Sequence, residues 1–225
     1  MRFDWQLANE HLAMRYPDNV RGYGAWQEFV KTILDLSPDK SAKDLPALHD
    51  NMLELFNGVP PAQGGSALPT VFVSHQRADA GSAERIAWLA CESGLDYWLD
   101  IHDPVLSLAT NTIPLSDPRY PLIVAAIIEM ALLNSSYLIA VHTSTSLASR
   151  WVPYEFGRAR DRNIRSQNCG GWFCPATTIG LHGDYVRLAQ VTQGGEHLLN
   201  SWLAAWSNGR PPLSWSLPSQ PAPLP

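Results

Sequence analysis

Short runs rich in β-branched and aromatic residues alternate with longer amphipathic stretches from residue 70 onwards, and this alternation constrains the fold more than any other feature. Strands are predicted at residues 70–74, 97–99 and 136–141, with a further candidate at 177–181. Helices are predicted at residues 80–92, 122–133, 151–162 and 196–206. Strands that alternate with helices form parallel sheets with right-handed crossovers. We therefore expect an α/β fold with a flavodoxin-like, doubly wound parallel sheet.

The chain before this alternation has a helical pattern. Apolar residues recur at helical spacing over residues 26–34 and 45–56, and more weakly over residues 4–14. The aromatic residues of this region are expected in its core, namely Trp5, Trp26 and Phe29. We expect a helical N-terminal extension at residues 1–59, followed by a Pro- and Gly-rich linker at residues 60–68. An α/β domain is expected at residues 69–208, and a Pro-rich tail that is disordered or wraps on the surface at residues 209–225.

Composition and charge exclude several classes of protein. The 225 residues carry a net charge of −5, so the chain has no basic field for nucleic acid or an anionic membrane. The longest apolar run, residues 122–133, contains Glu129 and is too short to span a bilayer. The start of the chain lacks the apolar region of a signal peptide, so we expect a cytoplasmic protein with reduced cysteines. Cys169 and Cys174 have no second ligand pair at zinc-site spacing, so no metal site is predicted.

Doubly wound sheets bind ligands beyond the carboxyl ends of their strands. Three segments are expected there: the loop after Ser74, the loop after Asp100, and the segment from His142 to Glu155. Residues 101–121, which contain four prolines, are predicted to form a long irregular loop. Loops of this length are usually functional or mobile, so this one is expected to contribute to the site.

The predicted helix after the third strand carries Trp151 and Glu155 four residues apart, on one face. A π surface beside a carboxylate suits a substrate with a flat ring next to a sugar. Cleavage of a glycosidic bond develops positive charge on the sugar, which a carboxylate stabilises. The residues alone also allow Glu155 to be a surface glutamate paired with Arg158 or Arg162, and Trp151 to be a core residue.

Polar residues after the first two strands extend this candidate site. The substrate-binding candidates are Ser74, His75, Gln76, Arg77, Asp100, Asp103 and Trp151. Arg77 is placed either to neutralise a pyrophosphate or to pair with Asp79 on the surface. Asp100 either contacts a ribose or caps its loop by accepting from backbone amides. No Gly-rich phosphate-binding loop is present, and Ser74 lies in no Gly-x-Ser-x-Gly motif, which argues against a hydrolase triad.

Four segments, taken in order, resemble the Toll/interleukin-1 receptor (TIR) domain family in its bacterial NAD-cleaving type. These segments are residues 71–75, 98–100, 136–141 and 149–155. The first strand ends in Ser, the second ends in Asp, and a Trp-x-x-x-Glu helix follows the third. The resemblance covers residues 68–162 well and continues loosely to residue 206. The chain differs from the family after Asp100, where the short Arg-x-x-x-Pro-Gly pattern is missing.

The resemblance implies an enzyme that breaks the bond between nicotinamide and ribose, with NAD+ as substrate rather than cofactor. Glu155 matches the family's catalytic glutamate. The products would be ADP-ribose or a cyclic ADP-ribose-type signal, made in defence against phage and read by a downstream effector. Many members complete their sites by self-association or with other TIR-type subunits. Two alternatives stay open: a non-catalytic TIR-like adaptor module, and an enzyme similar to nucleoside deoxyribosyltransferases.

Overall fold

The computed structural model describes residues 3–15, 21–35, 44–59, 68–161, 164, 166–213 and 219–225. The chain folds into two compact units. A helical unit comprises residues 1–67 and 100–134, and an α/β unit comprises residues 68–99 and 135–225. Residues 100–134, which the sequence placed inside an α/β domain at 69–208, therefore group with the N-terminal helices. The expected linker at residues 60–68 lies outside the described residues except for Leu68.

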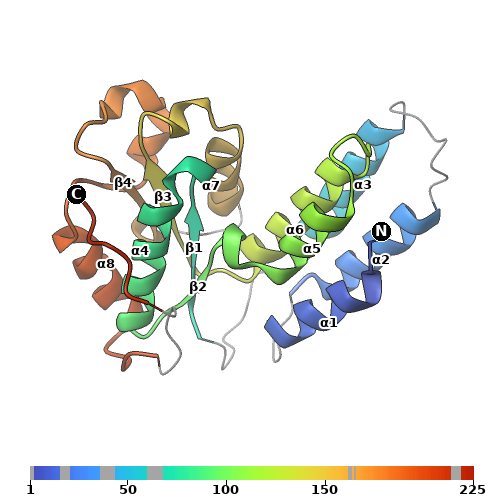
Figure 1. The fold of residues 1–225 in the computed structure, drawn as a ribbon, viewed down its shortest axis with the longest axis horizontal. Coiled ribbons are helices and arrows are strands. Elements are labelled where there is room, and N and C mark those ends of the chain that lie inside the picture. Colours follow the sequence, from blue (N-terminus) through green and yellow to red (C-terminus); the bar gives the residue numbers. More distant parts are fainter. Residues whose placement is uncertain are drawn as a thin grey trace. The chain divides into compact units, whose positions relative to one another are not determined.

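The α/β unit is built on a five-stranded sheet in which every pairing is parallel (Figure 1). The strands are β1 (Thr70–Ser74), β2 (Asp96–Trp98), β3 (Tyr137–His142), β4 (Cys169–Phe173) and β5 (Gln190–Gln193). Their order is β2-β1-β3-β4-β5, which is the flavodoxin-like order. The predicted fold class is confirmed. Because all strands run the same way, their carboxyl ends lie along one edge of the sheet.

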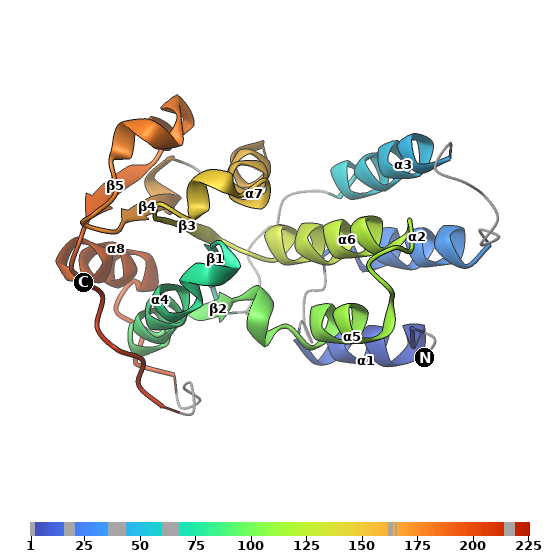
Figure 2. The same cartoon turned by 45° about the horizontal axis from the view of Figure 1, so that its top comes forward.

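Helices cover both faces of this sheet (Figure 2). Helices α4 (Ala80–Glu92) and α8 (His197–Ser207) pack on one face, and α7 (Trp151–Asp161) packs against β1 and β3 on the other. Successive side chains of a pleated strand point to opposite faces of the sheet. Val71, Ile139 and Trp172 join the cluster with α4 and α8, whereas Phe72 stacks on Trp98 with ring centroids 4.6 Å apart.

The fourth strand lies at β4, and the prediction of a strand at residues 177–181 is wrong: Ile179–His182 form a 3₁₀ helix. The strand was missed because Gly170 and Gly171 lower its apparent β-propensity. Packing explains Gly170, since a Cβ there would lie 2.7 Å from the ring of Trp202 on α8. β5 was also missed, because a sequence of Gln, Val, Thr and Gln carries little apolar signal.

The helical unit contains α1 (Trp5–Arg15), α2 (Tyr23–Asp35), α3 (Leu45–Asn57), α5 (Pro104–Thr112) and α6 (Tyr120–Leu133). Trp26 and Phe29 are fully buried in its core, as predicted, whereas Trp5 packs against that core and stays partly exposed. The prediction of an irregular segment over residues 101–121 is wrong, because α5 occupies its centre. Pro104, read as a loop signal, stands in the first turn of α5, where a proline is favourable.

The end of the chain is wrapped on the α/β unit where the structure describes it. Arg85 on α4 forms a bidentate ion pair with Glu196, in which Nε donates to Oε1 at 2.8 Å and Nη2 donates to Oε2 at 2.9 Å. The same carboxylate accepts from the backbone N of Leu224 at 2.8 Å, and the Leu224 side chain is buried in the cluster of α4 and α8. Of the two expectations for the tail, wrapping holds for residues 219–225; residues 214–218 lie outside the described part.

Candidate active site at the carboxyl edge of the sheet

The side chains of Ser74 and Glu155 meet in the interior of the α/β unit. Ser74, the last residue of β1, donates from Oγ to Oε2 of Glu155 over 2.5 Å. The two residues are 1% and 6% exposed, so the surface interpretation of Glu155 is wrong. A hydroxyl that donates to a carboxylate at this distance makes a charge-assisted bond, which holds the carboxylate in one orientation. The structure therefore brings together one candidate from the first strand and one from the helix after the third.

Helix α7 positions Glu155 through the residues on either side of it. Val152, Phe156 and Ala159 follow helical spacing, are nearly or fully buried, and fix the helix on β1 and β3. Oγ of Ser149 accepts from the backbone N of Val152 at 3.2 Å, which caps the start of the helix. Glu155 thus lies one turn into a capped helix, next to its buried face.

Trp151 lies at the start of the same helix and is 37% exposed. Its ring meets that of Tyr154 edge-to-face, with centroids 5.6 Å apart and an interplanar angle of 85°. The interpretation of Trp151 as a core residue is wrong, because more than a third of it faces solvent. An exposed indole one turn before a buried carboxylate leaves a π surface available to a planar ring.

The loop after β1 is tied to the loop after β3. The carboxylate of Asp79 accepts from Thr143 Oγ1 at 2.8 Å and from Thr145 Oγ1 at 2.9 Å. Gln76 caps the short 3₁₀ helix η1 (Arg77–Asp79) by accepting from the backbone N of Ala78. These bonds fix two of the three segments that the sequence assigned to the site.

Arg77 is exposed, and it forms no ion pair with any residue that the structure describes. Its predicted alternative partner, Asp79, is engaged by the two threonines instead. The guanidinium is therefore available to an anionic ligand. His75, which precedes it by two residues, is buried at 8% exposure directly after β1.

Asp100 and Asp103 belong to the helical unit. Oδ1 of Asp100 accepts from the backbone N of Ile101 at 2.7 Å, the loop-capping geometry named as its alternative role. Oδ1 of Asp103 accepts from the backbone N of Leu106 at 2.8 Å and caps α5. Substrate contacts by these two aspartates stay predictions.

A buried aromatic cluster at the ends of β3 and β4 was not predicted from the sequence. His142, 1% exposed, stacks on Phe173 with centroids 4.4 Å apart and meets the edge of His182 at 4.8 Å. Neither ring nitrogen of His142 has a hydrogen-bond partner within the described part of the chain. The position of His142 directly after a predicted buried strand was the one available signal.

Burial lowers the pKa of His142 to about 3, with a smaller contribution from His182, and burial also lowers the pKa of His182. The unfolded chain therefore binds protons at His142 below about pH 6.5, whereas the folded chain does so only near pH 3. The contribution of the neutral His142 to the free energy of unfolding is therefore fully present above the pKa that this histidine has in the unfolded chain. It is lost as the pH falls below that value. Between pH 7 and pH 5, we expect the free energy of unfolding of the wild type to fall by about 2 kcal/mol more than that of His142→Phe. Urea unfolding at both pH values measures this difference, and equal losses would contradict the assignment.

No group of three or more metal-ligating side chains occurs among the residues that the structure describes. The described part of the chain also contains no helix with the length and apolarity that a membrane crossing requires. Cys91, Cys169 and Cys174 form no disulfide; the first two are buried and Cys174 is partly exposed.

Comparisons with known proteins complete the description. No protein-family model matches the sequence. No curated protein matches it either. Among solved structures, the chain is similar to one described as a metazoan TIR-STING receptor from C. gigas in complex with 2′,3′-cGAMP, with 15% sequence identity and a TM-score of 0.44. The similarity covers 68% of this chain and 43% of that one, so the chain spans less than half of that receptor's length.

Proposed function

We propose that this protein cleaves the bond between nicotinamide and ribose in NAD+, with Glu155 as the catalytic carboxylate. The observation that carries the proposal is the buried hydrogen bond of 2.5 Å from Ser74 to Glu155. It places an oriented carboxylate at the carboxyl edge of a doubly wound sheet, where this fold binds its ligands. The resemblance of the surrounding motifs to NAD-cleaving TIR domains supports the choice of substrate.

Bond cleavage develops positive charge on the ribose, and a carboxylate held beside the sugar stabilises that charge. The nicotinamide ring carries a positive charge while it is bonded to the ribose and is neutral once it has left. No strong general acid is therefore needed. One carboxylate is therefore sufficient for this reaction. Trp151 would stack on the nicotinamide ring, while His75 and Gln76 would bind the nucleotide. Attack by water gives ADP-ribose, and attack by an adenine nitrogen gives a cyclic isomer.

The proposed setting is a cytoplasmic enzyme in bacterial defence against phage, which acts as an assembly of identical or other TIR-type subunits. A downstream effector would read the product if it is cyclic. These points rest on the resemblance of residues 68–162 to the family.

Arg77 allows the substrate class to be tested. If its guanidinium binds the pyrophosphate, Arg77→Met should raise KM for NAD+ about tenfold, because an exposed charge-assisted contact is lost. The same variant should cleave nicotinamide riboside, which has no pyrophosphate, at the wild-type rate. Nicotinamide release from both substrates measures this pair of effects. The matched control is Arg187→Met, an exposed arginine paired with Asp184.

Three results, from this assay and from parallel assays with deoxynucleosides or with added TIR-type partners, would argue against the proposal. Equal losses on both substrates would remove the pyrophosphate role of Arg77. Transfer of deoxyribose between nucleobases, without NAD+ cleavage, would favour the enzyme related to nucleoside deoxyribosyltransferases. Absence of turnover at every protein concentration and with TIR-type partners would favour the adaptor module.

A further inference from the structure

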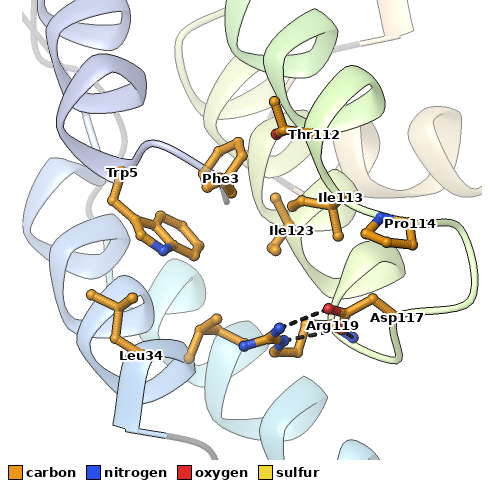
Figure 3. A pocket seen from close by; sticks show the side chains of 10 residues that line it. Phe3, Trp5, Leu34, Thr112, Ile113, Pro114, Asp117, Arg119 and Ile123 are labelled. Atoms are coloured by element: carbon orange, nitrogen blue, oxygen red, sulfur yellow. Dashed lines mark hydrogen bonds and ion pairs between the residues drawn. The ribbon is translucent and has the colours of Figure 1, made fainter. Parts of the chain in front are cut away.

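The helical unit contains a cavity of about 160 Å³ (Figure 3). Most of the side chains that line it are apolar and come from three separate stretches of the chain, namely Phe3, Trp5, Leu34, Ile113, Pro114 and Ile123, whereas Thr112, Asp117 and Arg119 add polar surface. Figure 3 shows Phe3 and Trp5 on one side of the space and Ile113 and Pro114 on the other. The proposed reaction uses none of these residues.

The size and lining of the cavity select a class of ligand. An apolar cavity of roughly 150 Å³ accommodates one benzene-sized ring. Phe3 and Trp5 meet edge-to-face, with centroids 4.5 Å apart and an interplanar angle of 80°. Aromatic walls of this kind favour a flat ring over a branched aliphatic group, because rings gain from stacked and edge-to-face contacts.

One edge of the cavity is polar. Arg119 donates from Nε to Oδ1 of Asp117 at 3.0 Å and from Nη2 to Oδ2 at 2.7 Å (Figure 3). The backbone N of Arg119 also donates to Oδ1 of Asp117, at 2.9 Å. Nη1 of Arg119 makes no hydrogen bond to any residue in the described ranges. This edge therefore offers a hydrogen-bond donor, while Asp117 cancels its charge.

We propose that this cavity binds a small, flat, uncharged ring compound whose carbonyl or amide oxygen accepts from Arg119. The ring fills the apolar space, and the oxygen satisfies Nη1. A charged carboxylate is disfavoured, because Asp117 already occupies the other side of the guanidinium and repels a second anion. The helical unit thereby gains a ligand-binding role that is independent of the proposed NAD+ chemistry.

Isothermal titration of the full chain with three probes tests this proposal. The probes share one ring: benzamide is neutral with an acceptor, benzoate is charged, and toluene has no acceptor. We expect saturable one-to-one binding of benzamide, at least about tenfold tighter than binding of benzoate or toluene. Arg119→Met should remove the advantage of benzamide over toluene. Asp117→Asn should improve benzoate relative to benzamide, because the repulsion is removed while an acceptor for Arg119 is kept.

Two further variants locate the binding. Ile123→Trp fills the cavity and should abolish benzamide binding, with circular dichroism and thermal unfolding to show that the chain still folds. If that variant does not fold, Ile113→Phe serves the same purpose with a smaller increase in volume. Leu115→Ala removes a side chain that is 76% exposed and outside the cavity, and should bind benzamide as the wild type does.

No benzamide binding up to about 10 mM would overturn the proposal, since a filled ring-sized cavity should give a stronger complex. Binding that survives in a folded cavity-filled variant would place the ligand elsewhere and would overturn it as well. Equal binding of all three probes would show that Arg119 has no part in recognition, and the assigned ligand class would be wrong.

Discussion

Glu155→Gln should lower nicotinamide release from NAD+ by at least about 10³-fold, because the charge that stabilises the developing cation is lost. Glutamine has nearly the same shape as glutamate, and its amide oxygen can still accept from Ser74. The substitution therefore removes the charge and keeps the packing of α7. The fluorescence of an etheno-adenine analogue of NAD+ follows cleavage continuously, and thermal unfolding verifies the fold.

The matched control is Glu92→Gln, at an exposed glutamate on α4 of the same unit. This variant should cleave at the wild-type rate, since it makes the same chemical change away from the site. A folded Glu155→Gln protein that retains more than about a tenth of the wild-type rate would exclude Glu155 as the catalytic carboxylate.

Ser74→Ala should lower kcat by about 10- to 100-fold with little change in KM. Ser74 is a positioning residue in this account: it acts on the reaction through Glu155, whose carboxylate it orients by the bond of 2.5 Å. Loss of a hydrogen bond to a charged group costs about 1.5–3 kcal/mol, which corresponds to that range of rates. Steady-state kinetics with NAD+ separate the two constants.

Further measurements on variants of Ser74 distinguish this positioning role from a purely structural one. Ser74→Thr keeps the hydroxyl and suits a strand, so it should recover most of kcat if its extra methyl group fits. Ser74→Ala should also show a shifted pH profile of kcat, because the ionised form of Glu155 loses its donor. If Ser74→Ala reduces only the thermal stability and leaves kcat and its pH profile unchanged, then Ser74 does not position the carboxylate.

The sequence predicted the fold well where the hydrophobic period is strong. β1 and β3 are apolar runs with clear ends, and α8 has evenly spaced apolar residues, so all three were placed within two residues. β4 and α5 were missed for the opposite reason. Their glycines and prolines are usually breakers, yet here Gly170 makes room for Trp202 and Pro104 starts a helix. Such roles depend on tertiary neighbours, which a single sequence does not reveal.

Part of the candidate site could likewise be predicted from the sequence, and part could not. The rule that parallel strands present their carboxyl ends at one edge was enough to associate Ser74 with Glu155. The bonds from Thr143 and Thr145 to Asp79 were not predictable, because they join residues more than 60 positions apart by side chains that are common on any surface. The burial of His142 was also missed, since a histidine after a strand reads as polar until its neighbours are known.

The most direct test of the central claim is mass-resolved chromatography of NAD+ incubated with the wild type and with Glu155→Gln, at several protein concentrations and with TIR-type partners. The account predicts that the wild type releases nicotinamide together with an equal amount of ADP-ribose or a cyclic isomer. Glu155→Gln should leave NAD+ intact under the same conditions. If the wild type leaves NAD+ intact throughout, or if both proteins cleave it equally, the assignment of Glu155 as the carboxylate of an NAD+-cleaving enzyme is contradicted.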